Sequence, residues 1–181
     1  MKKQFSVLLT LFACFYFISC KKESVTTPDN QSTSNATLSS KINAGSKTNS
    51  VKVPFKGSYS TTAQIQHGPP ILQQTITGTG NATHLGESVF VATVTVNLTT
   101  PPPFQVNGTT TFTAANGDQF YTIVTGTNTP TGNGTSRADL LHTIVGGTGR
   151  FVNASGSFTG IALNNQANST NTVVFDGYIS Y

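Results

Sequence analysis

From residue 51 to residue 181, short apolar runs with a two-residue period alternate with clusters of Gly, Asn and Pro. The period is clearest over residues 87–98, where every second residue from Phe90 to Leu98 is apolar and Thr or Asn fills most positions between them. Successive side chains of a strand point to opposite faces, so this segment predicts a strand with one buried and one solvated face. No part of residues 51–181 shows the 3.6-residue apolar period of a helix. The pattern therefore restricts this region to an all-β fold.

Eight runs of this kind follow one another after residue 50, over a length that suits one domain and is too short for two. Thr is frequent at the solvent-facing positions, where its branched carbon fits the pleated strand while its hydroxyl meets water. Eight antiparallel strands in one domain close into a barrel or split into a sandwich, and the strand count alone leaves both arrangements open. The predicted strands span residues 53–63, 71–78, 87–98, 109–115, 119–127, 138–145, 156–163 and 172–181.

The dipeptide Asn116-Gly117 lies between the fourth and fifth of these runs and is the strongest turn signal in the chain. A two-residue type I′ turn needs positive φ at both central positions, and Asn and Gly adopt that conformation more readily than other residues. The sequence therefore predicts a tight hairpin here, with the fourth and fifth strands as neighbours in the sheet.

The chain carries a formal net charge of +4, but its basic residues are concentrated before residue 53. Beyond that point Lys56, Arg137 and Arg150 are opposed by four acidic residues, which leaves a net charge of −1. The basic character thus belongs to the N-terminal segment and indicates no acidic partner for the domain. Charged residues make up only 9% of the chain, against about a quarter in an average domain. This scarcity argues against a nucleic-acid-binding domain with its basic stripe.

The first twenty residues have the organisation of a secretory signal. Two lysines precede an apolar run over residues 5–18, which as a helix would measure about 21 Å and is too short for a bilayer core of about 30 Å. The run leads into the sequence Phe-Ile-Ser-Cys at residues 17–20, which resembles the lipobox of bacterial lipoproteins. In that family the chain is cut before the cysteine, whose sulfur carries a diacylglycerol. The alternative is an ordinary signal peptide followed by an incidental cysteine.

The lipobox resemblance implies that Cys20 is the first residue of the mature chain and is acylated. Two or three acyl chains, at about 0.8 kcal/mol per buried methylene, hold a protein firmly on a membrane. Because Cys14 lies in the removed segment, the mature chain has no second cysteine for a disulfide. Lys21 in the second mature position favours the outer membrane of the bacterial envelope, on either its periplasmic or its surface face.

Residues 21–50 are mostly Ser, Thr, Asn, Lys and Gln. Such a composition cannot bury enough apolar surface to offset chain entropy, and a coil of this length spans on the order of 30 Å. We therefore expect three parts in the chain. They are a signal peptide over residues 1–19, a lipidated Cys20 with a flexible tether up to residue 50, and a β domain over residues 51–181.

A glycine-rich motif precedes the seventh run and reads Gly146-Gly147-Thr148-Gly149-Arg150-Phe151. Together with the sequence Ala-Ser-Gly-Ser-Phe at residues 154–158, it resembles the signature of dirigent proteins and of barrel domains similar to allene oxide cyclase. The resemblance implies an eight-stranded antiparallel barrel, in agreement with the strand count. Relatives of this barrel often form trimers, so the resemblance also implies that this chain could form a homo-oligomer. Because glycines take positive φ and approach other backbone closely, we expect a structural turn whose Phe151 plugs one barrel end with Phe158.

Three side chains are candidates for ligand binding. Arg150 is one of few basic residues in the domain, so we expect a fixed partner: an acidic side chain or carbonyl groups of the long turn, or the anionic group of a ligand. His84 lies in a turn and is either a hydrogen-bonded structural residue or a general base. His142 alternates with Leu140 and Ile144 and hence faces the same side as they do. We expect it to be a hydrogen-bonded histidine of the core or the barrel lining rather than a ligand-binding one.

The sequence gives no support for a metal site or a catalytic triad. No two histidines have the spacing His-x-x-x-His, and the domain lacks a Gly-x-Ser-x-Gly nucleophile motif. The glycine-rich turns lack the Lys-Ser/Thr pair and the following helix of a phosphate-binding loop. We therefore assign no catalytic residue, metal or cofactor from the sequence.

Two functions remain open. The first is a non-catalytic, lipid-anchored barrel that binds a small apolar molecule or a partner protein, or serves as a structural part of the envelope. Scarce titratable side chains favour it, because acid–base catalysis needs groups whose pKa can be tuned. The second is an enzyme or chirality-directing protein that steers a small apolar intermediate, as the resemblance implies. Acidic groups, His84 or His142 converging with Arg150 in an open cavity would favour the second function, and a lumen filled by Phe and Val would disfavour it.

Overall fold

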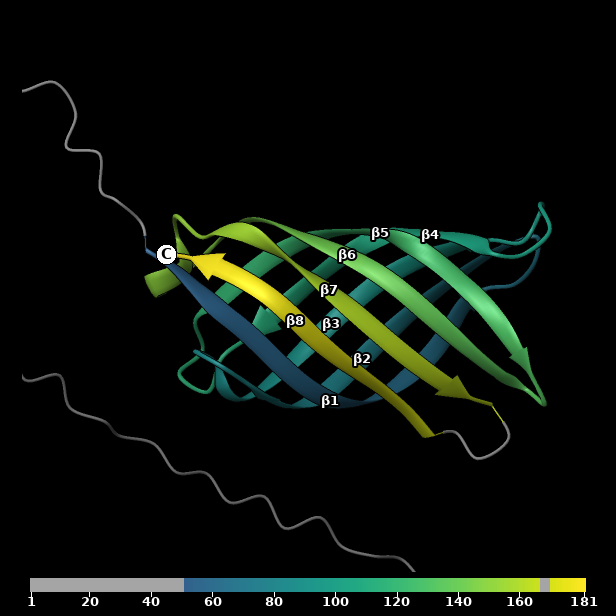
Figure 1. Ribbon diagram of the computed structural model, residues 1–181, viewed down its shortest axis with the longest axis horizontal. Coiled ribbons are helices and arrows are strands. Elements are labelled where there is room, and N and C mark those ends of the chain that lie inside the picture. Colours follow the sequence, from purple (N-terminus) through teal and green to yellow (C-terminus); the bar gives the residue numbers. More distant parts are fainter. Residues whose placement is uncertain (1–50, 167–169) are drawn as a thin grey trace, which may run out of the picture. The chain divides into compact units, whose positions relative to one another are not determined.

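The computed structural model describes residues 51–166 and 170–181. These residues form a closed barrel of eight antiparallel strands, in which each strand pairs with its neighbours in sequence and β1 pairs with β8 (Figure 1). The predicted eight-stranded barrel is thus confirmed. The expected signal peptide, Cys20 and the tether lie outside the described residues. The strands are β1 (Lys52–His67), β2 (Ile71–Ala82), β3 (Gly86–Asn97), β4 (Phe104–Thr113), β5 (Gln119–Gly132), β6 (Thr135–Gly147), β7 (Ser155–Asn165) and β8 (Thr170–Ser180).

Each predicted run falls on one of these strands, although the third, fourth and eighth runs extend one or two residues past the end of the strand, and several strands are longer than predicted. β4 begins at Phe104, five residues before the predicted start, although Asn107 and Gly108 read as strand breakers. Gly108 pairs with Val94 of β3 on one side and with Val124 of β5 on the other. In a closed barrel every strand has a neighbour on both sides, so ladder hydrogen bonds hold residues whose own strand propensity is low.

The hairpin between β4 and β5 is confirmed, but its predicted type I′ turn is wrong. The amide of Ala114 donates to the carbonyl of Asp118 at 2.9 Å, which leaves a loop of three residues, 115–117. Gly117 has a φ of 87°, whereas Asn116 does not have positive φ. A three-residue hairpin loop needs one residue in the left-handed region rather than two. Asn116 instead uses its side chain, whose Oδ1 accepts a hydrogen bond from the amide of Asp118 at 3.2 Å.

One end of the lumen is filled by aromatic rings, which we call the aromatic plug. The rings touch one another mostly edge to face, with the stacked pair of Phe112 and Phe120 at 4.7 Å between centroids near the middle. A single turn of 3₁₀-helix, η1 (Gly149–Phe151), brings one ring in from the β6–β7 connection. The plug consists of Phe55, Tyr59, Phe90, Phe112, Phe120, Phe151, Phe158 and Phe175, all of them buried.

Glycines opposite the rings make this packing fit. Gly78 pairs directly with Phe90 across β2 and β3, and a Cβ at Gly78 would overlap the ring of Phe90. Gly177 pairs with Phe158 across β7 and β8, and a Cβ there would lie 2.5 Å from the Cβ of Phe158. Each large side chain therefore occupies the space that its cross-strand neighbour leaves free, as close-packed interiors require.

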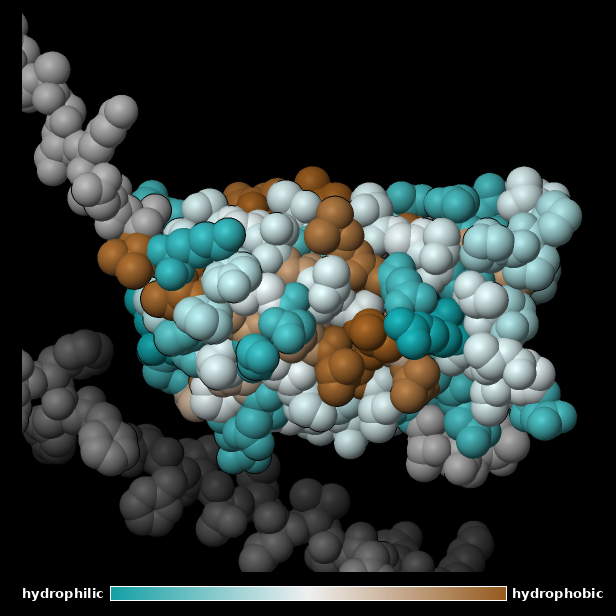
Figure 2. Space-filling model, viewed as in Figure 1, coloured by the Kyte–Doolittle hydropathy of each residue, from teal (hydrophilic) through white to brown (hydrophobic). Residues whose placement is uncertain are grey.

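The outer wall of the barrel is mostly polar. Apolar side chains are present in groups separated by polar ones, as the brown areas between teal and white ones show (Figure 2). Ile123, Leu141, Leu163 and Val174 are among the exposed apolar side chains. The outward positions of the strands thus confirm the alternation that the sequence predicts, with Thr prominent among them.

We predict that Phe112→Ala lowers the free energy of unfolding by about 3–5 kcal/mol, because it removes the ring that contacts most of the plug. Ile123→Ala is the matched control, since this outward side chain on β5 is 50% exposed and its loss should change stability by less than about 1 kcal/mol. Chemical denaturation of the full chain measures both. Equal losses for the two variants would contradict the assignment of the plug as the core.

Candidate functional site

The part of the lumen beyond the aromatic plug is a cavity of about 800 Å³. All eight strands contribute to its lining, with β1 contributing near its end, β2 near its start, β7 near its end and β8 near its start. The cavity therefore occupies the barrel end opposite to the one at which β1 begins and β8 ends (Figure 1). Its mouth lies among the exposed residues Gln64, Ile65 and Gln166.

The cavity is apolar in its middle and polar at both ends. Its walls are built by small and branched side chains, including Val94, Val106 and Val124. Phe90 and Phe175 of the plug form part of the inner end. Towards the mouth the lining is rich in side-chain amides and hydroxyls. These outer polar residues are Thr62, Gln64, Gln74, Asn128, Ser136, Asn164, Asn165, Gln166 and Asn171.

His142 is the one ionisable side chain in this lining, as far as the described residues extend. It lies on β6, faces inwards and is 3% exposed. Its ring stacks on Phe158 at 4.8 Å and meets Phe175 edge to face at 5.1 Å. Nδ1 shares a hydrogen bond with Thr122 Oγ1 at 3.1 Å. The prediction of a hydrogen-bonded histidine in the barrel lining is therefore confirmed for Nδ1.

Burial lowers the pKa of His142 from 6.5 to about 3. The ring is therefore neutral at physiological pH, so that one ring nitrogen donates a hydrogen bond and the other accepts one. Either arrangement satisfies the bond to Thr122, because a hydroxyl can both donate and accept. Nε2 accepts a hydrogen bond when Nδ1 carries the proton, and donates one when Nδ1 does not.

Three buried side-chain atoms have no hydrogen-bond partner within residues 51–166 and 170–181. They are Thr110 Oγ1, Asn128 Oδ1 and His142 Nε2. All three residues line the same cavity. A buried polar atom without a partner costs about 1–3 kcal/mol, so native interiors contain few of them. Their collection around one cavity marks that cavity as the candidate binding site.

The three atoms lie at two depths. Thr110 is directly opposite Thr122 in the register of β4 and β5, and Thr122 in turn bonds His142 on β6. These residues form a polar band across three adjacent strands beside the plug. Asn128 lies six residues further along β5, which corresponds to about 20 Å of strand towards the mouth. The apolar wall separates the inner band from Asn128.

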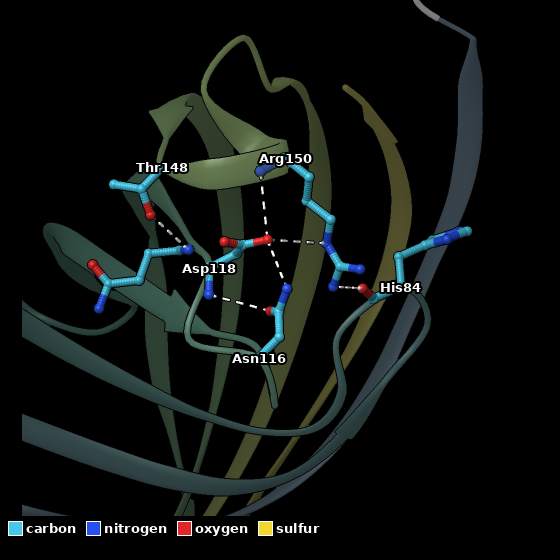
Figure 3. A network of polar contacts seen from close by, with 6 residues as sticks. His84, Asn116, Asp118, Thr148 and Arg150 are labelled. Atoms are coloured by element: carbon cyan, nitrogen blue, oxygen red, sulfur yellow. Dashed lines mark hydrogen bonds and ion pairs between the residues drawn. The ribbon is translucent and has the colours of Figure 1, made fainter. Parts of the chain in front are cut away.

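At the closed end, a separate polar network holds the loops together (Figure 3). Arg150 Nη2 donates to the carbonyl of His84 at 2.5 Å, and Arg150 Nε lies 3.8 Å from Asp118 Oδ2. The same carboxylate oxygen accepts from Asn116 Nδ2 at 2.8 Å and from the amide of Arg150 at 3.4 Å. The sequence left an acidic side chain, carbonyl groups or a ligand anion as partners for Arg150. In the structure its partners are the carboxylate of Asp118 and the carbonyl of His84 in a neighbouring loop. Arg150 thus joins three connections of the barrel.

His84 is a structural turn residue at this end. It has a φ of 67°, and its Nε2 lies 3.1 Å from the carbonyl oxygen of Pro54 on β1. The ring contacts Tyr181 edge to face at 5.8 Å. His84 and Arg150 are therefore brought together, but outside the cavity, and His142 is not part of their cluster.

The glycine-rich motif adopts the predicted turn. Gly146 and Gly149 have positive φ values of 131° and 54°, and a Cβ at Gly147 would lie 2.8 Å from the Cβ of Phe151. Phe151 is fully buried and packs edge to face on Phe120 at 5.6 Å. Phe151 and Phe158 accordingly both belong to the plug, as the sequence predicts.

Sequence reasoning missed Thr110, Thr122 and Asn128. A signal for the first two was present, because Thr110 has the same parity as Phe112 and Thr122 the same parity as Phe120. A hydroxyl in register with core rings indicates an inward polar residue. Asn128 lies beyond the predicted end of its strand, so its direction could not be assigned.

No group of three or more metal-binding side chains occurs in the described part of the chain. Over the same residues, no helix is long and apolar enough to cross a membrane.

We predict that acid destabilises the protein through His142. Because its pKa is lowered in the folded state, the unfolded chain binds the extra proton between about pH 6.5 and pH 3, and stability falls as pH falls through this window. Between pH 6 and pH 4 the wild type should lose about 2–3 kcal/mol more than His142→Phe. Denaturant titrations of both full chains over this range measure the difference. Parallel pH profiles would contradict the assignment of a buried, neutral ring.

Comparison with known proteins finds no matching family model, no matching curated protein and no matching solved structure. The resemblance of the glycine-rich motif to dirigent proteins and to allene oxide cyclase therefore stays a prediction from sequence.

Proposed function

We propose that this chain is a lipid-anchored protein of the bacterial envelope whose barrel binds a small apolar molecule without transforming it. The observation that carries the proposal is the cavity of about 800 Å³ in the half of the lumen that aromatic rings do not fill. Small-molecule sites commonly have about 300–1,000 Å³ and are lined mainly by apolar side chains with a few polar groups. The cavity lies within this range of volume and is apolar in its middle, with polar groups at its inner end and at its mouth.

The distribution of side chains across the wall supports the same proposal. Apolar side chains line the lumen, whereas the outer positions are mostly polar with Thr prominent. Transmembrane barrels have the reverse distribution, with an apolar outer band and a polar interior. An apolar lumen gives an apolar molecule a place to leave water, and burial of its surface contributes about 25 cal/mol per Å².

The placement of ionisable groups favours binding over catalysis. Asp118, Arg150 and His84 lie in the network at the closed end. Asp176 pairs with Lys56 at 3.4 Å, where both side chains are largely exposed. The lining of the cavity contributes one titratable group from the described residues, the neutral His142, and a general acid and base pair needs two groups with separated pKa values. We therefore rank the enzyme or chirality-directing function second.

The anchoring part of the proposal rests on the N-terminal sequence. The lipobox-like residues 17–20 place the acylated residue at Cys20, and thirty further residues precede the barrel. β1 begins at the plugged end of the barrel, opposite the mouth of the cavity. We propose the outer membrane as the location, with the barrel held by its lipid.

We predict that Ala162→Trp abolishes binding of a neutral apolar dye such as N-phenyl-1-naphthylamine. Ala162 faces the cavity on β7, and an indole at this position would occupy the lumen. Leu163→Trp is the matched control, because this neighbouring side chain faces outwards and is 54% exposed. The wild-type chain contains no Trp and each variant contains one, so the two variants are compared with the same indole background. Fluorescence titration of the full chains should show a loss of at least about tenfold for Ala162→Trp alone.

Equal dye affinity in the two variants would show that the dye binds elsewhere on the chain, and the proposed function would then fail. Absence of dye binding to the wild type would have the same consequence.

For the anchor, we predict that Cys20→Ala abolishes incorporation of labelled palmitate into the chain expressed in a bacterial host, because the acylated sulfur is lost. Cys14→Ala is the control and should leave labelling unchanged, since this residue lies in the segment that is removed. Persistent labelling of the Cys20 variant would refute the lipobox assignment.

A further inference from the structure

We propose that the molecule bound in the cavity carries a neutral hydroxyl group, which reaches the inner end of the lumen and hydrogen-bonds His142 Nε2 and Thr110 Oγ1. This inference rests on the proposed function and specifies the class of ligand: an apolar body with an uncharged hydroxyl at its leading end.

The inner end of the cavity is built to receive a polar group. His142 is 3% exposed and Thr110 is 2% exposed, and neither Nε2 nor Oγ1 has a partner within the described residues. Gly160 lies beside the imidazole, where a Cβ would come within 2.9 Å of Cε1 of Phe175 and 3.3 Å of Nε2, so the glycine lets both rings pack at this position. Both atoms therefore line the cavity with free hydrogen-bonding capacity.

The geometry favours a hydroxyl over other neutral groups. The imidazole is neutral and shares its Nδ1 bond with Thr122, so Nε2 either donates or accepts. The Thr110 hydroxyl can also do either. A ligand hydroxyl can donate to Nε2 and accept from Thr110, or accept from Nε2 and donate to Thr110, so it fits either state of the imidazole, whereas an ether oxygen only accepts.

Charged ligand groups are disfavoured by the same surroundings. The described lining contains no Asp, Glu, Lys or Arg, and the inner end is closed by the aromatic plug. A carboxylate or an ammonium ion carried to this depth would lose its hydration without gaining an opposite charge. Protonation of His142 cannot compensate a carboxylate easily, because burial keeps the ring neutral.

The middle of the cavity defines the rest of the ligand. Between the inner polar band and Asn128 the walls are lined by side chains such as Val94, Val106 and Leu140. Asn128 Oδ1 lies about 20 Å of strand away from Thr122 and also lacks a partner in the described chain. An elongated aliphatic body that follows the hydroxyl would fill this apolar stretch.

Competition for the dye tests the ligand class on the purified full chain. The competitors share one chain length and differ in the end group: 1-decanol, its methyl ether, decanoate and decylammonium. We expect 1-decanol to bind about three- to tenfold more tightly than the ether, as measured by the concentration that displaces half of the dye. One to two neutral hydrogen bonds account for a difference of this size. The two ions should compete at least about 100-fold more weakly than the alcohol.

Two variants test the residues. Thr110→Val replaces a hydroxyl by a methyl group of the same shape, and His142→Phe keeps an aromatic ring stacked on Phe158. Each should bind the dye as the wild type does and should lose the preference for the alcohol over the ether. Thr109→Val is the matched control, since its side chain is exposed on the outer face of the same strand and the preference should persist.

The outcomes separate this inference from the proposed function. If the dye binds and the alcohol preference disappears in both variants but persists in Thr109→Val, the inference stands. Equal displacement by all four competitors, or a preference that survives in Thr110→Val and His142→Phe, overturns the hydroxyl site while dye binding leaves the apolar cavity in place. If the dye does not bind the wild type, the proposed function fails and this inference fails with it.

Discussion

Pairing of β1 with β8 closes the barrel, and this closure gives the inward side chains of eight strands one fixed interior volume to share. Aromatic rings fill that volume at the end where the chain enters and leaves, because glycines such as Gly78 stand opposite them and make room. Beyond Phe90 and Phe175 the inward residues are smaller, and the wall cannot collapse to meet them because every strand is held on both sides. The cavity therefore begins where the aromatic plug ends.

Polar side chains at the closed end of the barrel have hydrogen-bond partners, whereas several along the cavity lack one among the described residues. At the closed end, Asp118 and Arg150 bond to each other and to neighbouring loops, and the buried hydroxyl of Tyr59 bonds Ser88 at 2.7 Å. Along the cavity, Thr110 and His142 each have one side-chain atom without a partner among the described residues. Such groups lower stability, and proteins retain them mostly where function uses them. The contrast within one barrel is what links the cavity to recognition of a polar group.

Much of the fold could be predicted from the sequence, because strand alternation and turn residues are local signals. The hairpin at Asn116 was placed correctly, but its turn type depends on the loop length, which the register of β4 and β5 determines. The direction of His142 followed from its parity with Leu140, whereas the lack of a partner for its Nε2 among the described residues depends on the rings of Phe158 and Phe175 that other strands place around it. Thr110 and Asn128 are candidate binding residues because their side-chain oxygens are buried without a partner in the described chain, and burial depends on the closed barrel rather than on the local sequence.

Native mass spectrometry of the full chain, purified from the cells that produce it, tests the central claim that the cavity is a ligand site. The account predicts a bound neutral molecule on the wild type and on Leu163→Trp, and its loss from Ala162→Trp, where an indole occupies the lumen. Retention of the same mass by all three chains, or a bound species that carries a fixed charge, would contradict it.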